Sequence, residues 1–394
     1  MEQKRIDNLV IEYEKRFHCK PTHVVKSCGR LEVIGNHVDY QNGYLINASI
    51  ENMSIVGVCA KRKDNVVHIE SIGYPMIEFK TNQIALNKKL DYETSKGLAK
   101  GVFKYFEKHG CKKGGFNLVM DSTLPSGVGV SSSAAFSMVV SKTLAMLYNE
   151  NKKLNKLFLA LASQWAENTY FGKKSGLQDQ LGSCSDGMEL LDFKDIQNPK
   201  IKHFIPNLGI YQIVLVKSKT SHANASDAFN SIPDDYNKIC KKYKVKALRF
   251  MQWEKFFADC NDPKLFAKRE YKRAIHFANE LLRVGRSYQA LTEGNIYEFK
   301  CCINESGDSN KNYMQNILIP GQKTSNLLEV FDLSTRIIKD GAIRIHGGGF
   351  GGACFVIINK NELQSYLNEV TKLVGKENIY NIKISTNALE WLAL

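Results

Sequence analysis

The sequence predicts a mixed α+β protein that folds as two domains. At 394 residues, the chain is longer than a single hydrophobic core usually supports. Short runs rich in β-branched residues fill the first quarter and return near the end, whereas helical periodicity dominates the segments between them. A polar stretch with two prolines, 194–208, follows the first alternation of strands and helices. We therefore expect one domain over 1–200 and a second over 201–394.

The first half is expected to begin with strands and to continue with helices. Apolar β-branched runs predict strands over 23–26, 31–34, 44–50, 54–60 and 66–69. Helical spacing over 94–109 stops at a glycine, and the run 115–120 predicts another strand. Two helices should follow, over 132–149 and 154–171, and the second has an almost wholly apolar centre that predicts burial on most sides.

The second half is expected to be mainly helical before it returns to strands. A strand over 188–193 precedes the polar stretch, and one over 210–216 follows it. A long helical region should then run from about residue 223 to residue 291. The remaining expected elements are strands over 343–346, 354–358 and 379–384 and a helix over 361–373.

The charge and the cysteines limit the class of protein. A formal net charge of +14 can indicate nucleic acid, a membrane surface or an anionic ligand. The densest basic stretch, 238–273, interleaves its charges with apolar side chains at helical spacing, which solvated helix faces explain without a partner. No recognised nucleic-acid module accompanies the charge, and no apolar run reaches the ~18 residues that a transmembrane helix needs. We therefore expect neither a nucleic-acid nor a membrane partner.

The cellular compartment is predicted from the thiols and the N-terminus. The ten cysteines are scattered and contain no Cys-x-x-Cys pair, which predicts neither a zinc site nor a disulfide framework. The N-terminus is charged and lacks the apolar core of a signal peptide. A cytoplasmic protein with reduced thiols fits both observations.

The most informative segment is a loop rich in glycine and serine, Leu-Pro-Ser-Gly-Val-Gly-Val-Ser-Ser-Ser-Ala-Ala, at 124–135. Gly127 and Gly129 permit a tight bend, and the helix that follows aims its free N–H groups and its dipole at that bend. This geometry favours a phosphate, although an ordinary loop with a serine helix cap is the alternative. The loop lacks the P-loop pattern, so a nucleotide site here must be of another type.

Two further motifs are rich in polar residues or in glycine. Residues 29–42 place a cation, an amide, an imidazole and a carboxylate close together, which suits sugar hydroxyls but is also typical of turns. Residues 347–352 formally match Gly-x-Gly-x-x-Gly. A strand rather than a helix follows this match, so we reject a dinucleotide fold. A glycine-dense turn between two strands instead permits a close backbone approach.

Together the three motifs resemble the galactokinases of the GHMP small-molecule kinase superfamily. That family carries a Gly-Arg…Ile-Gly-Glu-His-x-Asp-Tyr signature, a Pro-x-Gly-x-Gly-Leu-Ser-Ser-Ser-Ala loop and a late Gly-Gly-Gly-Phe-Gly-Gly turn. Order, spacing and length agree over nearly the whole chain. The resemblance implies an N-terminal ribosomal S5-like domain with the first two motifs, a C-terminal ferredoxin-like α/β sandwich domain with the third, and an active site in the interdomain cleft.

The resemblance also implies the reaction, which is phosphoryl transfer from ATP, with Mg²⁺, to the C1 hydroxyl of galactose. Asp179 would be the base that faces this hydroxyl. Arg30 would keep the pKa of Asp179 low and stabilise the charge on the moving phosphoryl group. Glu167 and Ser132 would ligate Mg²⁺, although the residues alone favour a helix-surface carboxylate for Glu167. The family further implies a monomer.

The other implied contacts divide between the sugar and the nucleotide. Those to the sugar are Asn36, His37, Asp39, Gly176 and Phe229. Those to ATP are Pro125, Ser126, Gly127, Val128, Gly129, Val130, Ser131, Ser132, Ser133, Gly348 and Gly349.

Three positions depart from the family pattern. Asn36 stands where the family has Glu, Phe229 where it has Tyr, and His346 where it has Thr. An amide in place of the carboxylate removes a charge-assisted bond worth roughly 1.5–3 kcal/mol, and the lost Tyr hydroxyl removes about 1 kcal/mol more. Galactose remains the first choice, and galacturonate, arabinose and N-acetylgalactosamine are alternatives. Galacturonate is favoured by the amide, which repels a C6 carboxylate less than a carboxylate does. A non-catalytic sugar sensor is the other alternative, but the intact loop, Arg30 and Asp179 favour an enzyme.

Overall fold

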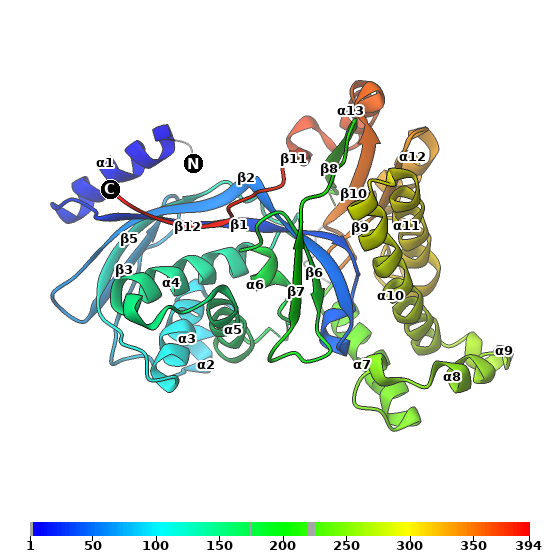
Figure 1. The fold of residues 1–394 in the computed structure, drawn as a ribbon, viewed down its shortest axis with the longest axis horizontal. Coiled ribbons are helices and arrows are strands. Elements are labelled where there is room, and N and C mark those ends of the chain that lie inside the picture. The colour runs from blue at the N-terminus through cyan, green and yellow to red at the C-terminus, as the bar shows by residue number, and fades with distance from the viewer. Residues whose placement is uncertain (1–2, 174, 220–224) are drawn as a thin grey trace.

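Two β-sheets with helices packed on them organise the molecule (Figure 1). The computed structural model describes residues 3–173, 175–219 and 225–394. The first sheet has the order β12 (Leu389–Ala393), β1 (His23–Ile34), β2 (Tyr44–Lys61), β5 (Phe116–Ser122), β3 (Val66–Ser71) and β4 (Ile77–Lys80). β2 also pairs with β6 (Met188–Asp192), which pairs with β7 (Lys200–Phe204). The second sheet has the order β11 (Ile379–Ile382), β8 (Tyr211–Lys217), β10 (Ala353–Asn359) and β9 (Gly341–His346).

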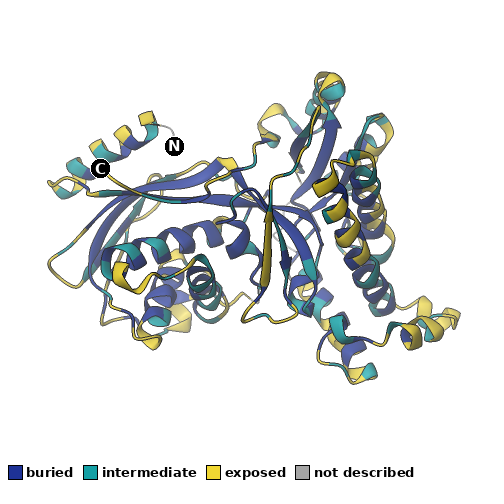
Figure 2. Ribbon diagram, in the orientation of Figure 1, coloured by how far each residue is buried: buried dark blue, intermediate teal, exposed yellow. Residues whose placement is uncertain are grey.

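Helices cover both faces of the first sheet. Alternate residues of its strands point to opposite faces, so Val24 and Val58 pack with the N-terminal helix α1 (Gln3–Phe17), whereas Val25 and Cys59 face the other side. The helices of this segment are α2 (Lys88–Asp91), α3 (Ser95–Lys108), α4 (Ser132–Tyr148), α5 (Lys156–Ala166) and α6 (Gln178–Gly182). Of these helices, α4 packs directly on β1 and β2, and Figure 2 shows it largely in the colour of buried residues, whereas α5 packs on α3 and α4.

The second sheet joins the two halves through a shared core. Leu215 and Phe355 on one face belong to the same buried cluster as Leu31 and Ile46 of the long strands β1 and β2. Val216 and Val356 on the other face pack against two helices, α12 (Asn326–Ile337) and α13 (Lys360–Val374). The other helices are α7 (Ser226–Tyr243), α8 (Trp253–Asp259), α9 (Pro263–Phe266), α10 (Arg269–Glu293) and α11 (Ile296–Ser309).

Several expected boundaries differ from the structure. β1 and β2 are single long strands where we expected two short ones each. The polar residues in the middle of β1 are buried, whereas Glu51 and Asn52 in the middle of β2 are exposed and the strand continues through them. The expected linker 194–208 contains β7, which pairs with β6. The helical region 223–291 divides into several helices, and residues 223–224 lie outside the described part. Helices α1, α11 and α12 and strands β4 and β12 were not expected.

The C-terminal strand β12 pairs with β1, so the first sheet draws on both ends of the chain. A division of the chain at residue 200 into two domains stays a prediction. Within the described ranges, no helix combines the length and the apolar character needed to cross a bilayer.

Candidate active site

The glycine- and serine-rich loop, hereafter the phosphate loop (124–131), connects β5 to α4. Gly127, Gly129 and Ser131 all have positive φ, at 73°, 77° and 60°. Such alternation turns successive backbone N–H groups toward one concave side. Ser131 occupies the N-cap position of α4, but its side chain makes no capping bond. The first turn of α4 therefore keeps backbone donors that suit an anion.

The loop is fixed to β1 at the position where that strand carries its first site residue. The backbone N–H of Arg30 donates to the carbonyl of Val130 at 2.9 Å. A Cβ on Gly29 would lie 2.6 Å from Leu124 Cδ2 and 3.2 Å from Val130 O, so the missing side chain of glycine eases this approach. Val128 and Val130 bury their side chains, whereas Ser126, Gly127 and Gly129 are exposed. The outer surface of the loop is therefore available to a ligand.

Arg30 and Asp179 form an ion pair, although 149 positions separate them in the sequence. Arg30 Nη2 donates to Asp179 Oδ1 at 2.8 Å, and Arg30 Nε donates to the same oxygen at 3.1 Å. Asp179 lies on the short helix α6. Two buried side chains of β2 bond to backbone carbonyls of α6 and hold it against the sheet: Asn47 donates to Gln178 O, and Ser49 donates to Gly182 O. The pair that the sequence predicted is therefore assembled.

The charges around Asp179 keep it ionised. Burial by itself raises the pKa of Asp179, but the charges of Arg30 and Lys173 outweigh this effect and lower the pKa below its usual value. The hydroxyl of Ser131, in the phosphate loop, also lowers the pKa of this carboxylate. Asp179 therefore remains an anion near neutral pH, within reach of the loop.

Glu167 lies in a π-helical turn, Glu167–Phe171, at the end of α5, and its side chain is 1% exposed. One of its oxygens accepts from Ser133 Oγ at 2.8 Å and from Lys173 Nζ at 3.1 Å, and the other accepts from Ser175 Oγ at 2.7 Å. Glu167 is therefore not the helix-surface carboxylate that its local sequence favours. Ser133, rather than the exposed Ser132, contacts Glu167, and a metal-binding role for Ser132 stays a prediction.

His37, Asp39 and Gly176 lie together beside the ion pair. A Cβ on Gly176 would lie 1.8 Å from Asp39 Oδ2, so glycine alone permits this contact. Burial and the charge of Asp179 raise the pKa of Asp39 to about 7. Burial lowers the pKa of His37, whose Nε2 donates to the carbonyl of Gly348 at 3.0 Å. Contact between these residues and a sugar stays a prediction.

Asn36 makes a complete set of hydrogen bonds within the protein. Its Nδ2 donates to Glu32 Oε1 at 3.0 Å and to Gly347 O at 2.6 Å. Its Oδ1 accepts from Asn310 Nδ2 and Asn316 Nδ2, each at 3.0 Å. An amide offers two donor and two acceptor positions, and all four are used. The side chain is thus a buried structural link, and direct sugar binding by Asn36 requires one of these bonds to break.

The late glycine turn packs against both other motifs. His346, at the end of β9, donates from Nδ1 to Val128 O at 3.1 Å and accepts at Nε2 from the backbone N–H of Glu32 at 3.2 Å. Burial and the charge of Arg30 lower the pKa of His346 to about 3, so it is neutral at physiological pH. A Cβ on Gly129 would lie 3.9 Å from Gly347 Cα, which places the turn beside the phosphate loop.

Phe229 lies against the same glycine turn. A Cβ on Gly348 would lie 2.2 Å from Phe229 Cε1, and the rings of Phe229 and Phe350 meet edge to face with centroids 5.3 Å apart. A Cβ on Gly349 would lie 2.2 Å from Asn316 O. Contacts of Phe229 with a sugar and of Gly348 and Gly349 with ATP stay predictions.

Three residues that support the Arg30–Asp179 pair were missed in the sequence. Lys173 bonds to Glu167 and lies with Nζ 3.7 Å from Asp179 Oδ2. The carboxylate of Glu32 is buried, accepts from Arg344 Nη2 at 2.6 Å, and lies 3.9 Å from Arg30 Nη1. The charge of Arg344 and that of Arg30 outweigh burial and lower the pKa of Glu32 to about 2. Lys173 lies outside the three motifs, and although Glu32 lies within the first of them, the residues around it do not indicate that its carboxylate is buried.

Gly182 is the third missed residue, and it sets the position of Arg30. A Cβ there would lie 2.2 Å from Arg30 Cγ and 2.9 Å from Asn47 Nδ2. We expect Gly182→Ala to displace the guanidinium and to lower kcat by about 10²-fold, the effect of a misplacement near 1 Å. Gly285→Ala is the matched control, since its Cβ would meet only Tyr44 Oη, at 3.7 Å. Equal kcat values for the two variants would contradict this role of Gly182.

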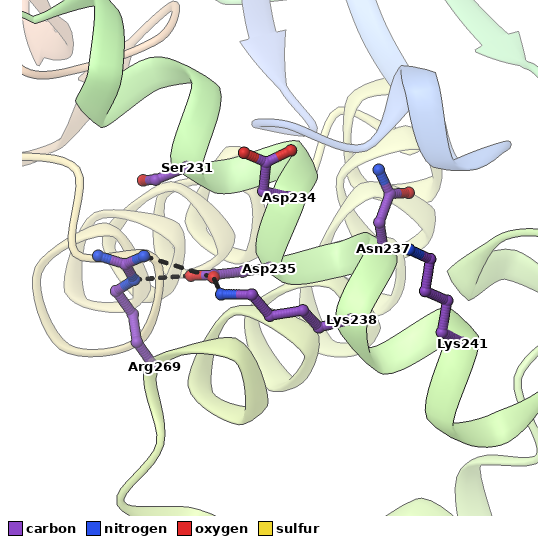
Figure 3. A pocket seen from close by; sticks show the side chains of 7 residues that line it. All are labelled: Ser231, Asp234, Asp235, Asn237, Lys238, Lys241 and Arg269. Atoms are coloured by element: carbon purple, nitrogen blue, oxygen red, sulfur yellow. Dashed lines mark hydrogen bonds and ion pairs between the residues drawn. The ribbon is translucent and has the colours of Figure 1, made fainter.

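A surface cavity of about 370 Å³ on α7 contains none of these site residues (Figure 3). Its lining residues are Ser231, Asp234, Asp235, Asn237, Lys238, Lys241 and Arg269. The buried Asp235 accepts from Lys238 at 2.9 Å and from Arg269 at 2.6 Å. The cavity is therefore bordered by the Arg269–Asp235 ion pair, which joins α7 to α10, and the carboxylate of Asp235 already has basic partners.

The comparisons with known proteins point to one family. A model described as "GHMP kinases N terminal domain" matches residues 97–187, and one described as "Galactokinase galactose-binding signature" matches residues 11–60. The chain is 29% identical to a galactokinase of Lactobacillus helveticus over 374 residues, with 93% of each protein covered. It is 28% identical to a galactokinase of Clostridium tetani over 380 residues, with 92% of each covered.

The fold is also that of a known kinase. The crystal structure of Lactococcus lactis galactokinase complexed with galactose matches with a TM-score of 0.85 and 23% identity, covering 98% of this chain and 99% of that one. The α+β fold of the GHMP kinases is thus confirmed. The galactose-binding signature spans the segment with Arg30 and Asp39, and the kinase model spans the phosphate loop and Asp179. The similarity to galactokinases therefore extends over nearly the whole length of the chain, and the two family models place its site segments in the GHMP kinase and galactokinase patterns.

Proposed function

We propose that this protein is a galactokinase, which transfers the γ-phosphoryl group of ATP to the C1 hydroxyl of galactose. The observation that carries the proposal is the ion pair of Arg30 and Asp179 at 2.8 Å, beside the phosphate loop, whose residue Val130 accepts from the backbone N–H of Arg30 at 2.9 Å. A base beside an anion-binding loop is what phosphoryl transfer to a hydroxyl requires. The galactokinases among its relatives support galactose as the acceptor.

The reaction would proceed by positioning and charge stabilisation. Asp179 would accept a hydrogen bond from the C1 hydroxyl and take its proton as the oxygen attacks the γ-phosphorus. Arg30, held by Asp179 and lying near Glu32, would donate to the phosphoryl oxygens during transfer. Its Nη1 is buried and has no hydrogen-bond partner among the described residues, so one donor direction is open for this role.

We also propose that Mg²⁺ accompanies ATP. The pair of Glu167 Oε1 and Ser133 Oγ, 2.8 Å apart, supplies the oxygen donors that Mg²⁺ prefers. Within the described ranges no group of three or more His, Cys, Asp or Glu residues could form an all-protein cage. This fits a cation that takes one or two protein ligands and completes its shell with phosphates and water. When bound, Mg²⁺ would neutralise charge on the phosphates.

A sugar panel with ATP and Mg²⁺ tests the function and separates the alternatives. ADP release should be highest with galactose, measured as kcat/KM against galacturonate, arabinose, glucose and N-acetylgalactosamine. A higher kcat/KM for galacturonate would instead favour a uronic-acid kinase, because Asn36 carries no charge to repel a C6 carboxylate. Galactose binding without any ADP release would favour a sugar sensor and contradict the proposal.

The setting of the enzyme is also proposed rather than established. We propose a cytoplasmic monomer with the domain division near residue 200. All ten cysteines have free thiols, which suits a reducing compartment. Light scattering at several protein concentrations tests the monomer directly.

A further inference from the structure

One end of the strands of the second sheet lies beside the phosphate loop. The pairing register of β8, β10 and β9 decides which of their side chains share the face toward the loop. Ala353 of β10 pairs with Lys217 of β8 on one side and with His346 of β9 on the other. Directly paired residues project their side chains from the same face of a sheet. Lys217 and His346 therefore share a face, and His346 is bonded to the loop at Val128.

Lys217 reaches the loop at the neighbouring residue. A Cβ on Gly127 would lie 3.5 Å from Lys217 Cε and 3.9 Å from its Nζ. Gly127 is one of the positive-φ residues that shape the loop. The strand end that carries Lys217 is fixed to the late glycine turn, because the backbone N–H of Ser218 donates to Gly352 O at 2.7 Å. The ammonium group therefore lies beside Gly127 of the phosphate loop, and the backbone next to Lys217 is bonded to the late glycine turn.

The charge balance makes Lys217 different from the other cations of the site. Arg30 is paired with Asp179, and Lys173 with Glu167, so each of these cations already faces a carboxylate. Lys217 is half-buried, and among the described residues its ammonium has no hydrogen-bond or ion-pair partner. An ATP tail bound at the loop would therefore find at Lys217 a positive charge that no carboxylate of the described residues compensates.

We propose that Lys217 binds the phosphate tail of ATP from the second half of the chain and holds it against the phosphate loop. This inference rests on the proposed kinase function. The loop and the α4 dipole supply only partial charges, whereas a lysine supplies a full charge and three donors on a flexible stem. Because Lys217 is not in contact with the Arg30–Asp179 pair, its contribution should appear in nucleotide affinity rather than in galactose affinity.

Calorimetric titration of ATP, ADP and adenosine tests the assignment without any turnover. We expect Lys217→Met to weaken ATP binding by about tenfold to a hundredfold, the range for a charge-assisted hydrogen bond, and to leave adenosine binding unchanged. Lys217→Arg should retain most of the affinity. Lys219→Met is the matched control, because the Lys219 side chain is exposed and two positions away, and it should bind ATP like the wild type.

Two outcomes would overturn the inference. One is ATP affinity of Lys217→Met within about twofold of the wild type, which is less than a single hydrogen bond is worth. The other is an equal loss of ATP and adenosine affinity, which would indicate a distorted site instead of a lost phosphate contact. Failure of the galactokinase proposal looks different, since wild-type protein would then bind ATP but release no ADP when galactose is added.

Discussion

Asp179→Asn is expected to lower kcat by about 10³-fold or more, because the amide cannot take the proton of the C1 hydroxyl and general-base catalysis contributes roughly 10²–10⁴-fold. The replacement keeps the shape of the side chain, so the galactose and ATP sites should persist. Asp179 is ionised and lies near the phosphate loop through Ser131, where it repels an ATP tail. ATP should therefore bind as tightly as to the wild type or more tightly, and steady-state kinetics with calorimetry measure both quantities.

The control for this variant is Asp195→Asn, which removes an exposed carboxylate of the same segment. Its kcat should match that of the wild type. Near-normal turnover in Asp179→Asn would refute the base, and a loss of ATP binding would mean that the residue is structural instead. Thermal unfolding helps to separate these cases. The substitution leaves Arg30, which is only 5% exposed, without its closest carboxylate, so a structural role predicts a clear fall in Tm together with the loss of ATP binding.

Local sequence patterns predicted the elements whose apolar residues recur at regular spacing. They missed the elements that depend on partners far away in the sequence. The phosphate loop and the helix after it were placed correctly, because glycine, serine and helical spacing act within a dozen residues. The middle of β1 was not expected to be strand, since Ser27 and Arg30 interrupt its apolar run. Both are buried there because their polar groups find partners in Ser183 and Asp179.

The same reason explains the site residues that were missed. Glu32 is one charged residue within an apolar strand, and nothing nearby in the sequence predicts its burial. Its cation, Arg344, comes 312 positions later, and Gln178, which donates to its other oxygen at 2.7 Å, comes 146 positions later. Asn36 was expected at the sugar because of its place in the motif, whereas Asn310 and Asn316, which occupy its amide oxygen, are visible only in the fold.

Asp39→Asn is expected to weaken galactose binding strongly and at the same time to stabilise the protein. If the variant loses two charge-assisted hydrogen bonds to sugar hydroxyls, each worth roughly 1.5–3 kcal/mol, the KM for galactose should increase by about 10²-fold or more. Yet burial and the nearby Asp179 raise the pKa of Asp39 to about 7, so its ionised form is unfavourable in the folded protein. An amide at this position avoids that cost.

The sign of the pH dependence follows from this raised pKa. Between the unfolded value of about 4 and the folded value of about 7, the native state binds more protons at Asp39 than the unfolded state, so this group lowers stability as pH rises through that window. Asp39→Asn should therefore raise Tm by roughly 2–4 °C at about pH 8, by less at about pH 5, and by nothing below about pH 4. Differential scanning calorimetry across this range measures the effect.

The same ionisation should govern sugar binding in the wild type. Hydroxyl groups that donate to Asp39 require the carboxylate, so the KM for galactose should increase about tenfold per pH unit below its pKa of about 7. Asp179 remains ionised over this range because its pKa is lowered, so kcat should change far less than KM. A pH-independent KM, together with a destabilised Asp39→Asn variant at about pH 8, would show that Asp39 is held by the fold for structural reasons and not for the sugar.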